Sequence, residues 1–180
     1  MTEHHWGIKG WKPNWVSSAS KLSRTLAELE LINQIFKGTW SLWDNEAWFE
    51  DAPVIFEIGK YQLEFCANKI GEFSVTKNTI DTNAVVSWCE EPSDTGDLTW
   101  RKNAHSEFLD LLGSKVTEVG VVEYNLDEGL QNLLGQSWVL SGSYIFCGAR
   151  FAKIFNALDC NGLSNKKNHI KGLRYIANRL

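Results

Sequence analysis

Residues 39–51, TWSLWDNEAWFED, bring together side chains that could support three kinds of chemistry. Indole faces stack on the CH groups of sugars, so Trp40, Trp43 and Trp48 could line a carbohydrate site. Paired carboxylates can serve as general acid and base, and exposed carboxylates can attract a basic protein. Because a buried carboxylate without a partner is costly, we expect the acidic side chains to be exposed and the indoles to serve mainly in packing. The acidic residues of the stretch are Asp44, Glu46, Glu50 and Asp51.

A second acidic stretch, EEPSDTGD at residues 90–97, indicates a polar loop because Pro92 and Gly96 interrupt regular structure. Its carboxylates are Glu90, Glu91, Asp94 and Asp97. The simplest interpretation of both acidic stretches is a solvated surface. The more specific hypothesis is that they form a binding surface for a basic protein, since complementary charge speeds encounter.

Two further carboxylates lie in residues 54–66, VIFEIGKYQLEFC, where apolar and polar residues alternate. The alternation predicts two strands around a Gly59-Lys60 turn, whose glycine suits a type II′ hairpin. This register places Glu57 and Glu64 on one face, and a glycosidase needs two carboxylates, one protonated and one ionised. The same alternation is typical of the solvated face of a half-buried sheet, which is what we expect for this pair.

Other chemical motifs are missing from the sequence. The histidines are scattered and no H-E-x-x-H occurs, so we expect no metal site. Neither a P-loop nor a G-x-G-x-x-G motif is present, so we expect no cofactor. Cys89 or Cys160 could pair with His105 or His169 as a nucleophile, but no G-x-S-x-G elbow accompanies them. We therefore expect no catalytic residues and no enzyme activity.

The overall composition favours a protein-binding role in the cytoplasm. A net charge of −4 and a pI near 5.6 argue against a nucleic-acid partner, whose binding domain should be basic. The N-terminal residues lack the apolar core of a signal peptide, and no apolar run is long enough to span a membrane. The four cysteines lack C-x-x-C spacing, which favours buried, reduced thiols in the cytoplasm. They are Cys66, Cys89, Cys147 and Cys160.

The helical signals lie in three regions. In residues 17–38 a stripe of apolar side chains recurs at helical spacing, with Ser17 or Ser18 as cap and Gly38 as end. The stripe consists of Leu22, Leu26, Leu29, Ile32 and Phe36. The spacing also predicts helices over 103–112 and over the basic residues 165–180, whereas residues 125–136 fit a short helix or a loop.

The remaining regular segments have strand character. Beyond the 54–66 hairpin, the predicted strands are 72–76, 84–89, 115–124, 137–147 and 149–158, with a turn at 159–162 around Asn161-Gly162. Helices and strands do not alternate strictly, which favours an α+β fold. We predict a mostly antiparallel sheet of about six to eight strands with an N-terminal, a middle and a C-terminal helix packed on it. One domain should span residues 1–180, with residues 1–16 as an irregular arm.

Two segments carry a resemblance to a known group of proteins. GTWSLWDNEAWFEDAPVIFEIGKYQLEFC (38–66) and FAKIFNALDCNGL (151–163) resemble immunity proteins of contact-dependent growth inhibition and related polymorphic toxin systems. The resemblance covers roughly residues 29–163. It implies a cytoplasmic protein that binds and neutralises one cognate toxin domain, in some cases a nuclease, without catalysis. It brings no fixed set of interface residues, because immunity interfaces vary among members.

Three functional hypotheses follow from the sequence. The first is an immunity protein whose toxin-binding surface includes the two acidic stretches, with no nucleic acid and no membrane as partner. The second is a carbohydrate-binding module or glycosidase-like enzyme that uses Trp40, Trp43, Trp48, Glu57 and Glu64. The third is an interaction protein with a housekeeping role.

Overall fold

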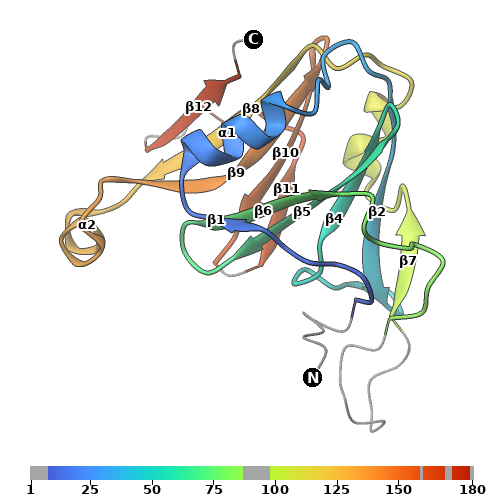
Figure 1. The fold of residues 1–180 in the computed structure, drawn as a ribbon, viewed down its shortest axis with the longest axis horizontal. Coiled ribbons are helices and arrows are strands. Elements are labelled where there is room, and N and C mark those ends of the chain that lie inside the picture. Colours follow the sequence, from blue (N-terminus) through green and yellow to red (C-terminus); the bar gives the residue numbers. More distant parts are fainter. Residues whose placement is uncertain (1–7, 87–97, 159, 169–171, 179–180) are drawn as a thin grey trace, which may run out of the picture.

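Two antiparallel β-sheets pack face to face, with one helix beside them (Figure 1). The computed structural model describes residues 8–86, 98–158, 160–168 and 172–178. Every strand pairing in this part of the chain is antiparallel. The α+β class with mostly antiparallel sheet is therefore confirmed. The twelve strands exceed the predicted six to eight, because four of them contain only two to four residues.

The first sheet has the order β1-β6-β5-β4-β2-β3, with β7 paired to the other side of β2. Its strands are β1 (Trp15–Val16), β2 (Phe36–Asp44), β3 (Ala47–Trp48), β4 (Val54–Ile58), β5 (Tyr61–Asn68), β6 (Glu72–Lys77) and β7 (Thr99–Lys102). The predicted 54–66 hairpin is confirmed. Ile58 pairs with Tyr61, and Gly59 has a φ of +58°, as the first position of a type II′ turn requires.

The second sheet has the order β11-β10-β9-β8-β12. Its strands are β8 (Glu118–Asn125), β9 (Trp138–Cys147), β10 (Arg150–Asn156), β11 (Asn161–Ser164) and β12 (Leu173–Ala177). Because β11 and β12 occupy opposite edges, the chain between them must cross the sheet. Lys167 lies against the rings of Phe146 and Tyr175, and the Tyr175 hydroxyl donates to the Asn168 carbonyl. Lys167 and Asn168, the described part of this connection with such contacts, therefore lie against the outer face, where a small apolar cluster contains Tyr144 and Phe151.

The helices are short: α1 (Ala19–Ala27), the 3-10 helix η2 (Ser106–Leu111) and α2 (Glu128–Leu134). Helix η2 confirms the predicted middle helix, and α2 resolves the open choice at 125–136. The prediction that the first helix continues to Gly38 was wrong. Glu30 and Asn33 adopt φ values of +49° and +66°, which end the helical path, and Phe36 opens β2.

The C-terminal helix predicted over 165–180 is also wrong, since β12 pairs with β8 in this region. Leu173 and Ala177 share a face in either conformation. In the strand Tyr175 joins that face and pairs with Val122. The predicted 159–162 turn lies too late in the chain, because Asn161 and Gly162 belong to β11.

The main core lies between the two sheets and combines side chains from both with Leu22 and Leu26 of α1. A second cluster covers the opposite face of the first sheet and contains Trp11 and Trp100. Trp11 is only 2% exposed, so the later part of the predicted arm is pinned by an aromatic side chain as expected. Cys66 and Cys147 are buried free thiols, and Cys89 lies outside the described residues. Among the described helices, none has the length and apolar character that crossing a bilayer requires.

Candidate functional site

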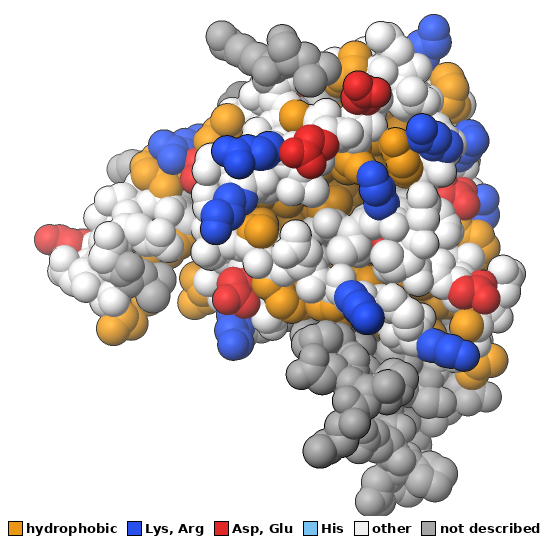
Figure 2. Space-filling view, in the orientation of Figure 1, with side chains coloured by type: hydrophobic (Ala, Val, Ile, Leu, Met, Phe, Trp, Pro, Cys, Tyr) orange, Lys and Arg blue, Asp and Glu red, His pale blue; other side chains and the backbone are white. Residues whose placement is uncertain are grey.

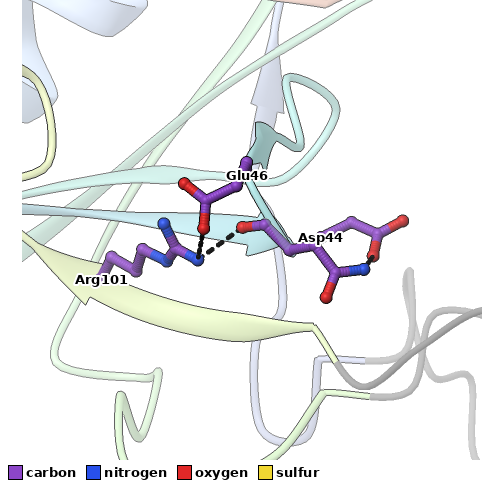
Figure 3. A network of polar contacts seen from close by, with 4 residues as sticks. Asp44, Glu46 and Arg101 are labelled. Carbon is purple, nitrogen blue, oxygen red and sulfur yellow. Dashed lines mark hydrogen bonds and ion pairs between the residues drawn. The ribbon is translucent and has the colours of Figure 1, made fainter.

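The tip of the β2–β3 hairpin is held by Arg101 of β7. Trp43 pairs with Trp48 across the hairpin, and Asn45 and Glu46 form the connecting turn. The Arg101 Nη2 atom lies 2.5 Å from the Asn45 carbonyl oxygen and 3.4 Å from Glu46 Oε1 (Figure 3). Its guanidinium also lies over the Trp43 ring, 5.1 Å from the centroid. One cation therefore fixes the turn and partly balances Glu46, whose side chain is 93% exposed.

The acidic bend that follows β3 is fixed from below by Asn161 of β11, which is 1% exposed. The Asn161 side-chain amide donates to the Glu50 and Ala52 carbonyl oxygens, both at 2.8 Å, and its backbone N–H also donates to Glu50. Its side-chain oxygen accepts the Ala67 backbone N–H at 2.8 Å. The backbone of the bend is thus tied to two strands, while the side chains of Glu50 and Asp51 stay exposed.

The carboxylates of this region are poorly balanced by positive charge. Among the described residues, no ion pair reaches Asp44, Glu50 or Asp51. The pKa of Asp51 is raised, first by partial burial and second by the negative charge of Glu50. Both causes disfavour the charged carboxylate, so a cation placed against Asp51 would relieve them. We call Asp44, Glu46, Glu50 and Asp51 the acidic hairpin.

The second predicted acidic stretch lies between two described residues, Val86 and Leu98. Its carboxylates Glu90, Glu91, Asp94 and Asp97 lie outside the described residues. Of the predicted strand at 84–89, residues 87–89 also lie outside them, and Val86 pairs with Leu98 through backbone hydrogen bonds in both directions. Leu98 precedes Thr99, which pairs with Trp43 next to Asp44.

The three tryptophans of residues 39–51 do not share one face. Trp40 packs with Trp11 and Trp100 in the cluster outside the first sheet. Trp43 and Trp48 point the other way and contact His105, with ring centroids 5.7 and 4.7 Å from the imidazole. The expected packing role is confirmed for these indoles, and they do not form a single stacking platform.

Sequence reasoning left His105 without a specific role, because an isolated histidine has no pattern of its own. The structure places it in the aromatic layer under the acidic hairpin, 8% exposed, with Nδ1 3.9 Å from Glu107 Oε1. No described residue is hydrogen-bonded to its Nε2. Burial lowers the pKa of His105, and the nearby Glu107 opposes this only in part. The histidine therefore acts as a neutral packing group.

Replacing His105 with phenylalanine should flatten the pH dependence of stability. The unfolded chain takes up a proton near the ordinary histidine pKa of about 6.5, whereas the folded chain takes it up only at lower pH. The stability contributed by neutral His105 is therefore present above pH 6.5 and is lost as the pH falls from there towards the folded pKa. Urea unfolding of the natural chain and of His105→Phe at pH 7.5 and at pH 5.0 measures this dependence. If both proteins lost the same free energy of unfolding between the two pH values, the prediction would be contradicted.

The carboxylate pair of the 54–66 hairpin lies on one face, as the register predicts, but the expectation of a solvated face is wrong for Glu64. Its side chain is 0% exposed. One of its oxygens accepts the backbone N–H groups of Thr79 (2.6 Å) and Ile80 (3.1 Å), and the other accepts the Thr79 hydroxyl (3.1 Å). Glu57 is partly buried and lies 2.6 Å from the Lys102 ammonium. The pair therefore offers no open space between two carboxylates.

On the face shown in Figure 2, Lys and Arg side chains are interspersed with Asp and Glu. Within the described part of the chain, no three His, Cys, Asp or Glu side chains come close enough to hold a metal ion. On a fixed backbone the acidic hairpin thus offers three exposed carboxylates, Glu46, Glu50 and Asp51, and the partly buried Asp44, with Glu46 partly balanced by Arg101. Comparison with protein-family models, curated proteins and solved structures finds no match to this chain.

Proposed function

We propose that this chain is an immunity protein that binds and neutralises a cognate bacterial toxin domain in the cytoplasm, without catalysis. The observation that carries the proposal is the acidic hairpin, in which three of the four carboxylates are exposed and only Glu46 has a described ion pair, while its backbone is tied down by Asn161 and Arg101. The toxin surface that fits it is basic.

A fixed acidic surface suits tight and fast binding. Ordering a flexible loop on association costs free energy, and a loop that is already fixed avoids that cost. Unpaired carboxylates steer a basic partner and raise its association rate, especially at low salt. A toxin that acts on nucleic acid needs a basic surface for phosphate, and an acidic inhibitor would cover that surface.

The carbohydrate alternative receives less support from the same residues. A sugar platform needs indole faces side by side, whereas Trp40 lies on the opposite side of the sheet from Trp43 and Trp48. A glycosidase needs access to both carboxylates, and Glu64 is enclosed by its three hydrogen bonds. These observations favour a protein partner over a glycan.

A toxin domain encoded immediately upstream of this chain's gene would be the partner to test. Co-expression of the chain should restore growth of cells that produce the toxin domain, and the two purified proteins should form a complex. Absence of growth rescue and of a complex would overturn the proposal, as would the lack of any toxin gene at that position.

Neutralising the acidic hairpin should slow association with that toxin domain. The variant Asp44→Asn, Glu46→Gln, Glu50→Gln, Asp51→Asn removes the attracting charges, so we expect at least about a tenfold lower association rate and a weaker salt dependence. A control with the same change in net charge is Glu28→Gln, Glu30→Gln, Asp81→Asn, Glu128→Gln. Stopped-flow mixing over a range of salt concentrations measures the association rate and its salt dependence. Equal association rates for the hairpin variant and the control variant would exclude the acidic hairpin as the interface.

A further inference from the structure

A half-open cavity of about 420 Å³ lies at one end of the second sheet, and none of the acidic hairpin residues lines it. Its walls come from segments far apart in the sequence, including β9, β10, the β5–β6 turn and helix α2, which projects beside the sheet (Figure 1). Most of the lining is apolar, with Leu126, Leu130 and Val139 among it. A volume of this size and an apolar lining are typical of small-molecule sites.

One charged side chain, Lys153 of β10, lines this cavity. Lys153 is 4% exposed, and no ion pair joins it to a described residue. Its ammonium lies over the ring of Phe155, 4.5 Å from the centroid, and 6.0 Å from the ring of Tyr175. Aromatic faces balance a cation only in part. Burial lowers the pKa of Lys153, so this environment disfavours its charged form.

Among the described residues, the charged groups near Lys153 carry a net positive charge. Lys167 lies over the opposite part of the same aromatic cluster, 5.2 Å from the Tyr175 centroid. The carboxylate of Glu118 accepts the Tyr144 hydroxyl at 2.8 Å and forms no ion pair with either lysine. An anion with an apolar body would therefore complete both the charge and the packing of this region.

The rim of the cavity is apolar as well. Ile70, Tyr124 and Leu158 line it and are 51%, 45% and 84% exposed. Large apolar side chains exposed around one opening mark a binding site more often than scattered ones do. The apolar rim and the buried ammonium group in the wall together fit an amphipathic ligand, with an apolar body and an anionic group.

We propose that this cavity binds a small apolar carboxylate, whose acid group pairs with the Lys153 ammonium and whose chain lies against Leu126, Leu130 and Val139. The site goes beyond the proposed toxin interface and does not depend on it, because the two share no residue. Ser141 and Asn168 also line the cavity and supply polar groups for the second carboxylate oxygen.

Calorimetric titration with decanoate and decanol tests the head group. We expect decanoate to bind more tightly than decanol, and its affinity to rise roughly fourfold for each methylene added from hexanoate to decanoate. The variant Lys153→Met should lower decanoate affinity at least about tenfold and leave decanol unchanged. Lys166→Met is the matched control at an exposed lysine, and it should bind decanoate as the natural chain does.

Several outcomes would overturn the site. They are no decanoate binding, equal affinities for decanoate and decanol, and unchanged decanoate affinity in Lys153→Met. If Lys153→Met does not fold, Leu130→Glu on α2 serves instead: the lost apolar contact should weaken both ligands, and the added carboxylate should weaken decanoate more than decanol, so equal weakening would also overturn the site. Asp159 lies outside the described residues. Decanoate binding only after Asp159→Asn would mean that this carboxylate already occupies Lys153, which also overturns the proposal.

Discussion

Replacing Asn161 with alanine is expected to lower the free energy of unfolding by about 3–5 kcal/mol, because each buried polar group that loses its partner costs about 1–3 kcal/mol. The side chain of Asn161 serves the carbonyl oxygens of Glu50 and Ala52 and the backbone N–H of Ala67. An alanine side chain leaves the Ala52 carbonyl and the Ala67 N–H without this partner, whereas the Glu50 carbonyl keeps the hydrogen bond from the backbone N–H of residue 161. Urea unfolding followed by tryptophan fluorescence measures the loss.

Asn165→Ala provides the control for this prediction. Asn165 makes one exposed hydrogen bond, from its side-chain amide to the Glu107 carbonyl, so its loss should cost less than about 1 kcal/mol. The Asn161 variant should also bind the proposed toxin domain more weakly, since the Glu50–Asp51 bend would be free to move. Equal stabilities for the two alanine variants would show that Asn161 does not brace the acidic hairpin.

Substitutions at Glu64 should separate a structural carboxylate from a catalytic one. Leucine leaves the backbone N–H groups of Thr79 and Ile80 without an acceptor, so Glu64→Leu should lose about 3 kcal/mol or more of stability. Glutamine keeps one oxygen for both N–H groups, and its amide can donate to the Thr79 hydroxyl in place of accepting from it. Glu64→Gln should therefore lose only about 1 kcal/mol, the difference between a charged and a neutral acceptor.

The test is whether Glu64→Gln has a higher free energy of unfolding than Glu64→Leu. Chemical denaturation of both proteins beside the natural chain gives it directly. If Glu64→Gln proved as unstable as Glu64→Leu, the hydrogen-bonding geometry at residues 79–80 would be wrong. If neither variant lost stability, the hydrogen bonds of Glu64 to residues 79–80 would not stabilise the fold, and a role of Glu64 in a carbohydrate site would need testing again.

The sequence predicted those elements whose local pattern agrees with their tertiary partners. The 54–66 hairpin is one, since its alternation and its Gly59 turn specify the same register. The C-terminal strand is the opposite case. Leu173 and Ala177 are four residues apart, a spacing that fits a helical stripe and a strand alike, and the choice depends on the edge of β8 that accepts β12.

The acidic hairpin was recognisable from composition, but its supports were not. Carboxylates at this density had to lie at the surface, and the structure agrees for Glu46, Glu50 and Asp51. Asn161 is far from them in sequence, and its Asn-Gly pair looked like turn chemistry. The sequence could have predicted that Trp40 and Trp43 lie on opposite faces of the sheet, because residues three apart point to opposite sides of any strand.

The cavity around Lys153 could not be predicted from the sequence. In residues 149–158 the lysine occupies an alternating position that is solvated on most sheets. It is buried because the connection between β11 and β12 crosses that face, and strand order is not visible in a local pattern.

Helix α1 joins the earliest part of the chain to a strand that is synthesised much later. The first sheet uses residues 15–102, so most of its pairings can form as that part leaves the ribosome. The apolar face of α1, Leu22 and Leu26, belongs to a core that also requires Val119 and Val121 of β8. In the nascent chain α1 can pack on β6 of the first sheet, but its apolar face is only partly covered until β8 follows, which makes α1 a segment for a chaperone to shield during synthesis.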